Sequence, residues 1–181
     1  MDDRQRFSEA VLPHVNDALS LARWLTGNAT DAEDVVQEAC VRAFNAIASV
    51  RNAVDARAWL LTIVRNTAFT WIAKNRPKSL VTTDDERLFE QAGLEMIAPQ
   101  ASPEAVLIEK TDAEQLHLAI ASLPLSYREV LVLREIEGLS YQEISKVLSI
   151  PIGTVMSRLA RARSSLIQRI GLASKGKAGA A

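Results

Sequence analysis

The sequence is poor in the residues on which disulfides, metal sites and catalytic clusters depend. Its 181 residues include one cysteine, Cys40, and two histidines, His14 and His117, which lie far apart in the chain. A single cysteine excludes an intrachain disulfide framework, and isolated histidines do not make a metal-ligand set. No glycine-rich phosphate loop and no nucleophile motif is found. We therefore predict no catalytic site, no metal, no cofactor and no small-molecule substrate.

Long apolar runs and strand patterns are missing as well. No run could cross a bilayer, and the N-terminal residues lack an apolar signal segment. These absences predict a soluble, cytoplasmic protein without membrane insertion. No clear alternating apolar pattern and no Asn-Gly or Asp-Gly hairpin is present, which argues against a sheet. We expect an all-α fold.

Helix start and stop signals are frequent. Four pairs have the capping-box spacing: Thr30 with Glu33, Thr83 with Glu86, Ser126 with Glu129, and Ser140 with Glu143. Ser102 before Pro103 is a further start signal, and Gly27, Gly138 and Gly171 are predicted stops. The expected helices are 5–26, 31–48, 56–75, 103–121, 127–137, 141–148 and 152–170, with a short one near 84–92.

The expected organisation is two small helical bundles joined by a linker. The bundles are residues 1–77 and 103–181, and the segment 78–102 between them is acidic, follows Pro77 and ends with Pro99 before Pro103. The acidic composition of that segment suits a free tether, whereas Leu88, Phe89 and other apolar residues suit a packed loop with a helix. The sequence leaves both alternatives open. Whether the two bundles pack together is left open by the sequence.

Charge is distributed unevenly on a chain whose formal net charge is only −1. No acidic residue follows Glu143, whereas seven basic residues do: Lys146, Arg158, Arg161, Arg163, Arg169, Lys175 and Lys177. A basic block on a near-neutral chain predicts a directed electrostatic face.

The last helix has the pattern of a DNA reader. Its predicted buried stripe is Ile152, Val155, Leu159, Ala162 and Leu166. The opposite face carries short hydrogen-bonding residues and arginine, and such a face suits a major groove. With the capped helix 141–148 before it, the segment predicts a helix-turn-helix. Arg158, Arg163 and Lys146 are then expected to contact phosphates. The alternative is an ordinary solvated helix face.

Helix 31–48 is two-sided, with Asp31, Asp34 and Glu38 opposite its apolar face. Such a stripe repels DNA, so it is either solvated or a docking site for a basic protein surface. Helix 56–75 is apolar around most of its circumference and also carries basic and amide groups. These could hold unpaired bases together with aromatic side chains, although we expect Trp59 and Phe69 to be core residues.

At this point the parts resemble a family, the extracytoplasmic-function group of bacterial RNA polymerase sigma factors. Asp31–Ala39 is similar to the core-polymerase-binding helix of that family, and Ala58–Asn66 to its promoter-melting region. The C-terminal resemblance lies in Leu123–Pro124, Arg128–Leu131, Gly138–Ile144 and Gly153–Leu159.

The resemblance implies three interfaces. Core RNA polymerase would bind Asp31, Asp34, Gln37, Glu38 and Phe44. The −10 promoter element would be bound by loop 49–55 and helix 56–75, through Arg51, Asn52, Arg65, Asn66, Trp71, Lys74 and Arg76. The −35 element would be read by helix 152–170, through Thr154, Met156, Ser157, Arg158, Ala160, Arg161 and Arg163. An anti-sigma factor is the further partner that the resemblance implies.

Three departures limit what carries over. Met156 and Ala160 differ in size and chemistry from residues that some relatives carry, so the −35 sequence is not transferred. Pro151 occupies the expected N-cap of the last helix. Two rivals stay open: a helix-turn-helix repressor that binds duplex DNA unaided, and a sigma-like decoy that only sequesters an anti-sigma factor.

Overall fold

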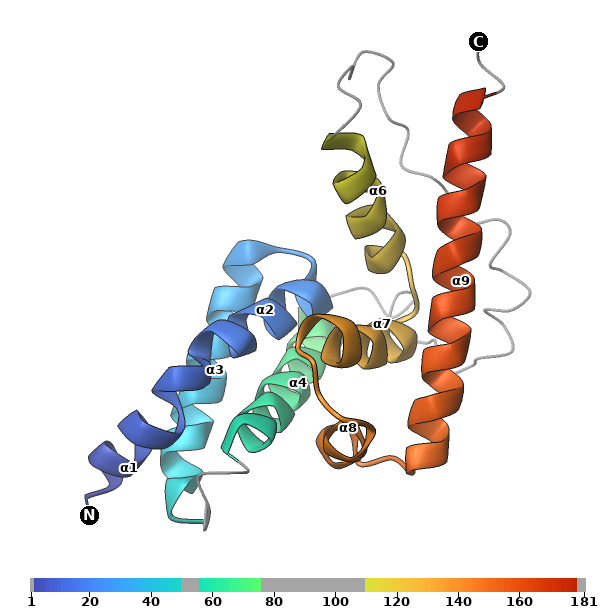
Figure 1. Ribbon diagram of the computed structural model, residues 1–181. Helices are drawn as coiled ribbons and strands as arrows, with labels where there is room; N and C mark the ends of the chain where they lie inside the picture. The colour runs from blue at the N-terminus through green and yellow to red at the C-terminus, as the bar shows by residue number, and fades with distance from the viewer. Residues whose placement is uncertain (1, 50–55, 76–109, 179–181) are drawn as a thin grey trace.

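The computed structural model describes residues 2–49, 56–75 and 110–178, and these residues form helices without any strand. The order is α1 (Asp3–Ala10), η1 (Leu12–His14), α2 (Val15–Thr26), α3 (Ala29–Ala46), η2 (Ile47–Ser49), α4 (Ala56–Asn75), α6 (Lys110–Ala121), α7 (Leu125–Leu131), η5 (Val132–Ile136), α8 (Tyr141–Leu148) and α9 (Ile152–Ala178). The predicted all-α fold is confirmed, and Figure 1 shows α1–α4 as one bundle and α6–α9 as another.

The N-terminal bundle is held by α2, α3 and α4, which pack on one another. Each helix contributes fully buried apolar side chains to the core, as Leu21, Val35 and Leu60 illustrate with at most 1% exposure. The buried face of α3 is mainly alanine and valine, and such small side chains let its neighbours approach closely. The helix predicted over 56–75 is confirmed with its bounds, whereas 5–26 is wrong as one helix. Pro13 lies in the 3-10 turn between α1 and α2, where its ring and missing N–H interrupt the helix.

The C-terminal bundle consists of α6, α7 and α9, with α8 beside α9 (Figure 1). The helix predicted over 127–137 is α7 followed by a π-helical turn, in which the Glu137 N–H donates to the Val132 carbonyl at 3.0 Å. The helix predicted over 141–148 is confirmed. Of the helix predicted over 103–121, residues 103–109 lie outside the described part of the chain, as does the segment near 84–92.

The predicted helix ends hold in part. Gly27 and Gly138 have positive φ angles, 72° and 69°, as the left-handed ends of helices require. Gly171 is not a stop, because α9 continues to Ala178. The tight turn before α9 depends on Ser149 at φ 54°, and Gly153 lies inside α9 instead.

The predicted capping boxes have three outcomes. Ser140 with Glu143 is confirmed, and both reciprocal hydrogen bonds are present. Thr30 with Glu33 is wrong, because Asn28 caps α3 by accepting the Asp31 N–H at 3.1 Å. Ser126 with Glu129 is wrong too, since α7 begins at Leu125 behind Pro124. Thr83, Glu86, Ser102 and Pro103 lie outside the described residues.

Replacing the Ser140 hydroxyl removes half of the confirmed capping box. We expect Ser140→Ala to lower the free energy of unfolding by about 1 kcal/mol, a typical value for such a cap. Hydrogen bonds from Ser140 lower the pKa of Glu143, so this carboxylate stabilises the fold above its ordinary pKa. That contribution disappears as the pH falls through the lowered value.

Urea denaturation followed by circular dichroism measures the change. Ser164→Ala is the matched control, since Ser164 is an exposed residue inside α9. An equal loss of stability in both variants would show that the cap contributes nothing of its own.

Candidate nucleic-acid interface

The exposed face of α9 carries most of the side chains predicted to meet base edges. Val155, Leu159 and Ala162 are buried at 0%, 1% and 0% exposure, and this orients the opposite face outward. Met156, Ser157, Ala160 and Arg161 are exposed, and Thr154 is half-buried. Ile152 departs from the predicted buried stripe, since it is 41% exposed in the first turn, and Leu166 is only partly buried.

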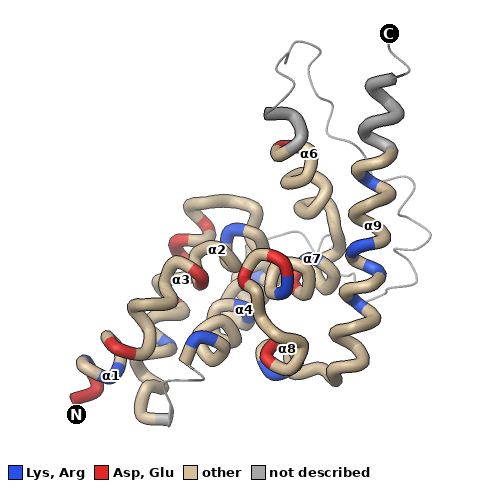
Figure 2. The backbone as a smooth tube through the Cα atoms, viewed as in Figure 1, with Lys and Arg blue, Asp and Glu red and all other residues tan. Residues whose placement is uncertain are grey.

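The N-terminus of α9 follows Pro151 directly. The N–H groups of Thr154 and Val155 both donate to the Pro151 carbonyl, at 3.0 and 3.1 Å. Pro151 therefore occupies the N-cap as predicted, without a side-chain cap. Figure 2 shows basic positions along the described part of α9 and no acidic ones, which is the charge pattern that favours DNA phosphates.

The two arginines predicted to contact phosphates are both engaged by carboxylates. Arg163 Nε donates to Glu135 Oε1 at 3.1 Å, and this pair raises the pKa of the arginine. Arg158 is 21% exposed, and its Nη1 lies 3.8 Å from Glu129 Oε1. Both pairs lie within the C-terminal bundle and link α9 to α7 and η5.

The basic and aromatic residues of α4 are divided between surface and interior. Asn66 and Lys74 are exposed, and Trp71 is half-buried. Arg65 lies over the ring of Phe69, 3.9 Å from its centroid. Trp59 and Phe69, which we expect to be core residues, are partly buried and pack against the core. Arg51, Asn52 and Arg76 lie outside the described residues.

The acidic side of α3 faces outward. Asp34, Gln37 and Glu38 are exposed, Asp31 is half-buried, and Glu38 accepts from Arg42 at 2.8 Å. Phe44 is 41% exposed and packs edge-on against Phe7, with ring centroids 5.5 Å apart. One face of α3 thus combines carboxylates with an accessible aromatic ring.

Contacts between the two bundles are the feature that the sequence did not predict. Arg65 of α4 donates to Glu129 of α7 from Nε at 2.8 Å and from Nη2 at 3.3 Å. Arg57 of α4 also crosses to the other bundle, where its Nη2 donates to the Glu137 carbonyl at 2.7 Å. Within its own bundle, Arg57 donates from Nε to Asp17 Oδ2 at 2.6 Å. One signal is present in the sequence, because Glu129 directly precedes the apolar run Val130–Leu133, and a buried acid requires a cationic partner.

The environment of Glu137 perturbs its titration. Burial raises the pKa of this carboxyl, and the charge of Asp17 adds to the increase. A hydrogen bond from Ser20 and the charge of Arg57 act in the opposite direction. The contact between the bundles therefore contains a carboxyl that gains a proton more readily than an exposed glutamate.

Among the described residues, no group of histidine, cysteine or acidic side chains is arranged to hold a metal ion. None of the helices in that part of the chain is long and apolar enough to cross a membrane.

Comparisons with known proteins agree with the two-bundle arrangement. The family model described as Sigma-70 region 2 matches residues 10–78, and the one described as Sigma-70, region 4 matches residues 113–166. The RNA polymerase sigma-H factor of Pseudomonas aeruginosa is 36% identical over 167 residues, which cover 91% of this chain and 86% of that protein. The ECF RNA polymerase sigma-E factor of Escherichia coli K12 is 33% identical over 172 residues, which cover 93% and 88%.

Two solved structures share the fold. The sigma factor RpoE from Bartonella quintana, in complex with the anti-sigma factor NepR, has a TM-score of 0.67 at 24% identity and covers 91% of this chain and 96% of its own. CnrH, in complex with the cytosolic domain of CnrY, has a TM-score of 0.63 at 24% identity and covers 93% and 90%.

Both region models match in order, and curated relatives are more than 30% identical along more than 90% of the chain. The chain therefore belongs to the extracytoplasmic-function group of RNA polymerase sigma factors, which direct promoter-specific transcription initiation and are not enzymes.

Proposed function

We propose that the steps of promoter recognition are divided among segments of this chain. Residues 1–77 bind core polymerase and the −10 element, residues 103–181 read the −35 element, and residues 78–102 link them. The observation that carries the proposal is the face of α9, where apolar residues are buried on one side while Met156, Ser157 and Arg161 are exposed on the other.

The −35 element would be read by Thr154, Met156, Ser157, Ala160 and Arg161. Short side chains near the start of α9 allow the helix to approach base edges closely, and an arginine can pair with guanine through two hydrogen bonds. Arg158 and Arg163 would bind phosphates, which fixes the position of the helix without specifying sequence.

The −10 element would be held by α4 and the preceding loop. Asn66 and Lys74 are exposed on α4, and Trp71 is accessible enough to stack on an unpaired base. Arg51, Asn52, Arg65 and Arg76 complete the proposed set. Such contacts offset the few kcal/mol that removing a base from the stack costs, on the order of that seen in base-flipping enzymes.

Core polymerase would bind the exposed side of α3 through Asp31, Asp34, Gln37, Glu38 and Phe44. The carboxylates suit a basic partner surface, and Phe44 supplies apolar area. The proposed site of action is the cytoplasm, where the polymerase works. An anti-sigma factor is a proposed regulator, because the sigma factor RpoE of similar fold was solved in complex with one.

Run-off transcription with purified core polymerase on a pool of genomic promoter fragments tests the proposal as a whole. Transcripts that depend on this protein, with aligned start sites, would reveal both promoter elements. Specific duplex binding without polymerase would favour the repressor rival, and core binding without any transcript would favour the decoy.

Reversing the charge of Asp34 tests the polymerase surface. Asp34→Lys should weaken core binding at least tenfold, which corresponds to about 1.4 kcal/mol, while thermal unfolding stays unchanged because the side chain is exposed. Fluorescence anisotropy of the labelled protein titrated with core polymerase measures the affinity. Glu114→Lys on α6 is the matched control, since it reverses an equally exposed acid far from α3. Equal affinities of wild type and Asp34→Lys would remove this face from the proposal.

Arg161 and Arg163 separate base reading from phosphate binding. Arg161→Ala should cost about 1–3 kcal/mol of promoter preference and should relax specificity at one −35 position. Arg163→Ala should weaken all −35 sequences alike and reduce the salt dependence of binding. Competition between −35 variants in the transcription assay measures both effects. A uniform loss from Arg161→Ala would reassign that residue to a phosphate.

A further inference from the structure

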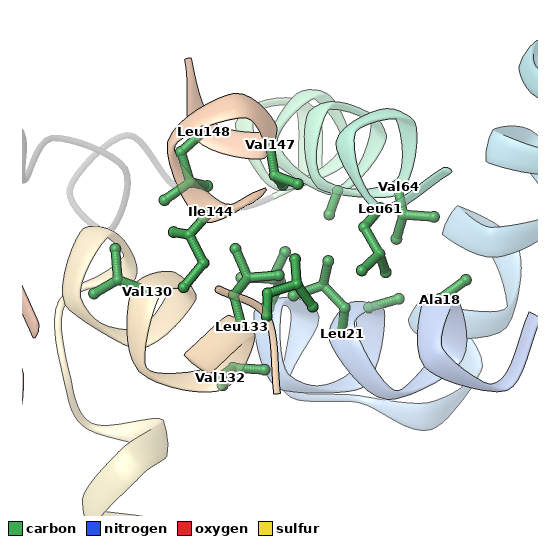
Figure 3. Packing of buried hydrophobic residues seen from close by; sticks show 14 of the residues in the cluster. Ala18, Leu21, Leu61, Val64, Val130, Val132, Leu133, Ile144, Val147 and Leu148 are labelled. Atoms are coloured by element: carbon green, nitrogen blue, oxygen red, sulfur yellow. The ribbon is translucent and has the colours of Figure 1, made fainter. Parts of the chain in front are cut away.

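The two bundles are joined across an apolar layer by an ion cluster centred on Glu129. Figure 3 shows Leu21 and Leu61 from the N-terminal bundle facing Leu133 and Val147 from the other. Helix α4 packs on α8, and α2 packs on α7. At the edge of this layer the Glu129 side chain, 1% exposed, binds Arg65 at 2.8 Å and lies 3.8 Å from Arg158.

Each arginine of this cluster belongs to a different proposed DNA surface. Arg65 is on the −10 helix α4, and Arg158 is on the −35 helix α9. The Glu129 carboxylate accepts from two nitrogens of the Arg65 guanidinium, at 2.8 and 3.3 Å. A guanidinium uses the same fork geometry to bind a phosphate, so Glu129 and a DNA backbone compete for the same donors.

Distance makes this arrangement incompatible with promoter binding. Elements centred at −10 and −35 are about 25 base pairs apart, or about 85 Å at roughly 3.4 Å for each base pair. The whole of α9 has 27 residues, so its length is only about 40 Å. Since α4 and α8 are in contact, and α8 also packs on α9, the bundles must separate before both elements can be read together.

We propose that Glu129 is the latch of a closed, self-inhibited state of the free protein. Its carboxylate occupies Arg65 and holds the −10 helix against the helix-turn-helix, and binding of core polymerase opens the latch. The inhibitory part of this proposal rests on the proposed role of α4 in reading the −10 element. The contact of Arg57 with Glu137 supports the same closure from the other end of α4.

Distances between two spin labels test the latch in the full chain. With Cys40 replaced by alanine, cysteines are introduced at Asn16 on α2 and Gln168 on α9, which are both exposed. Double electron–electron resonance then measures the distance distribution for the otherwise wild-type chain, for Glu129→Gln and for Glu135→Gln. The last variant is the matched control, because it removes one carboxylate charge from a pair that lies entirely within the C-terminal bundle.

The otherwise wild-type chain should give one narrow distance, and Glu129→Gln should add a longer, broader population. Glu135→Gln should match the otherwise wild-type chain, and core polymerase should lengthen the distance in all three. The apparent affinity for core should rise in Glu129→Gln by the same factor as the open fraction, on the order of three- to tenfold. Identical distributions in the two glutamine variants would overturn the latch.

Arg65→Gln is the second variant, in case Glu129→Gln does not fold. It breaks the same ion pair from the other bundle, and the Arg65 side chain is 22% exposed. It should lengthen the distance in the same way, and an unchanged distance would overturn the latch. The transcription assay is read separately. Longer distances with unimpaired promoter opening in Arg65→Gln would keep the latch and reject Arg65 as a −10 residue.

Discussion

An ionised carboxylate removed from water is costly unless cations and hydrogen bonds surround it, and Glu129 imposes that requirement on much of this molecule. Its side chain is 1% exposed and has an arginine from each bundle within 4 Å. Removing one partner of such a buried pair leaves the other charge unpaired. The loss of stability then exceeds the net contribution of the intact pair. The apolar layer buries side chains from both bundles, and Glu129 adds a contact that an arginine of the other bundle satisfies.

The sequence predicts the elements of the fold well where periodicity and caps agree. Helix 141–148 is bounded by a capping box, and helix 56–75 is recovered with its bounds even though it has no single polar face. The errors arise where a local residue and a long pattern disagree. Pro13 overrides the apolar pattern and divides the first helix, because its ring and missing N–H interrupt helical hydrogen bonding. At Gly171 the helix continues instead, since glycine lowers helix propensity without blocking the backbone hydrogen bonds.

The candidate surfaces are predicted less evenly. The outward faces of α3 and α9 follow from the helical periodicity of their apolar residues, because the apolar side of each helix must be buried. The ion pairs of Arg65 and Arg158 do not follow from the sequence. Both arginines meet the carboxylate of Glu129, which is distant from them in sequence and has the spacing of a capping residue. The spacing of Glu129 from Ser126 fits a capping box, so the sequence predicts that this carboxylate caps a helix. Only the packing of α7 shows that the same carboxylate faces inward.

The π-helical turn between α7 and α8 has a consequence for how this chain can change in length. It places one more residue in the turn than an α-helix would, and the Glu137 carbonyl that follows it receives the Arg57 guanidinium. Deleting one residue inside regular α-helix rotates everything downstream by about 100°, the angle between successive residues. In the wide π-helical turn the same deletion would instead tighten the turn to α-helical spacing and keep the downstream helices close to their present orientation. A change in length of one residue is therefore tolerated better in this segment than within α7 or α9.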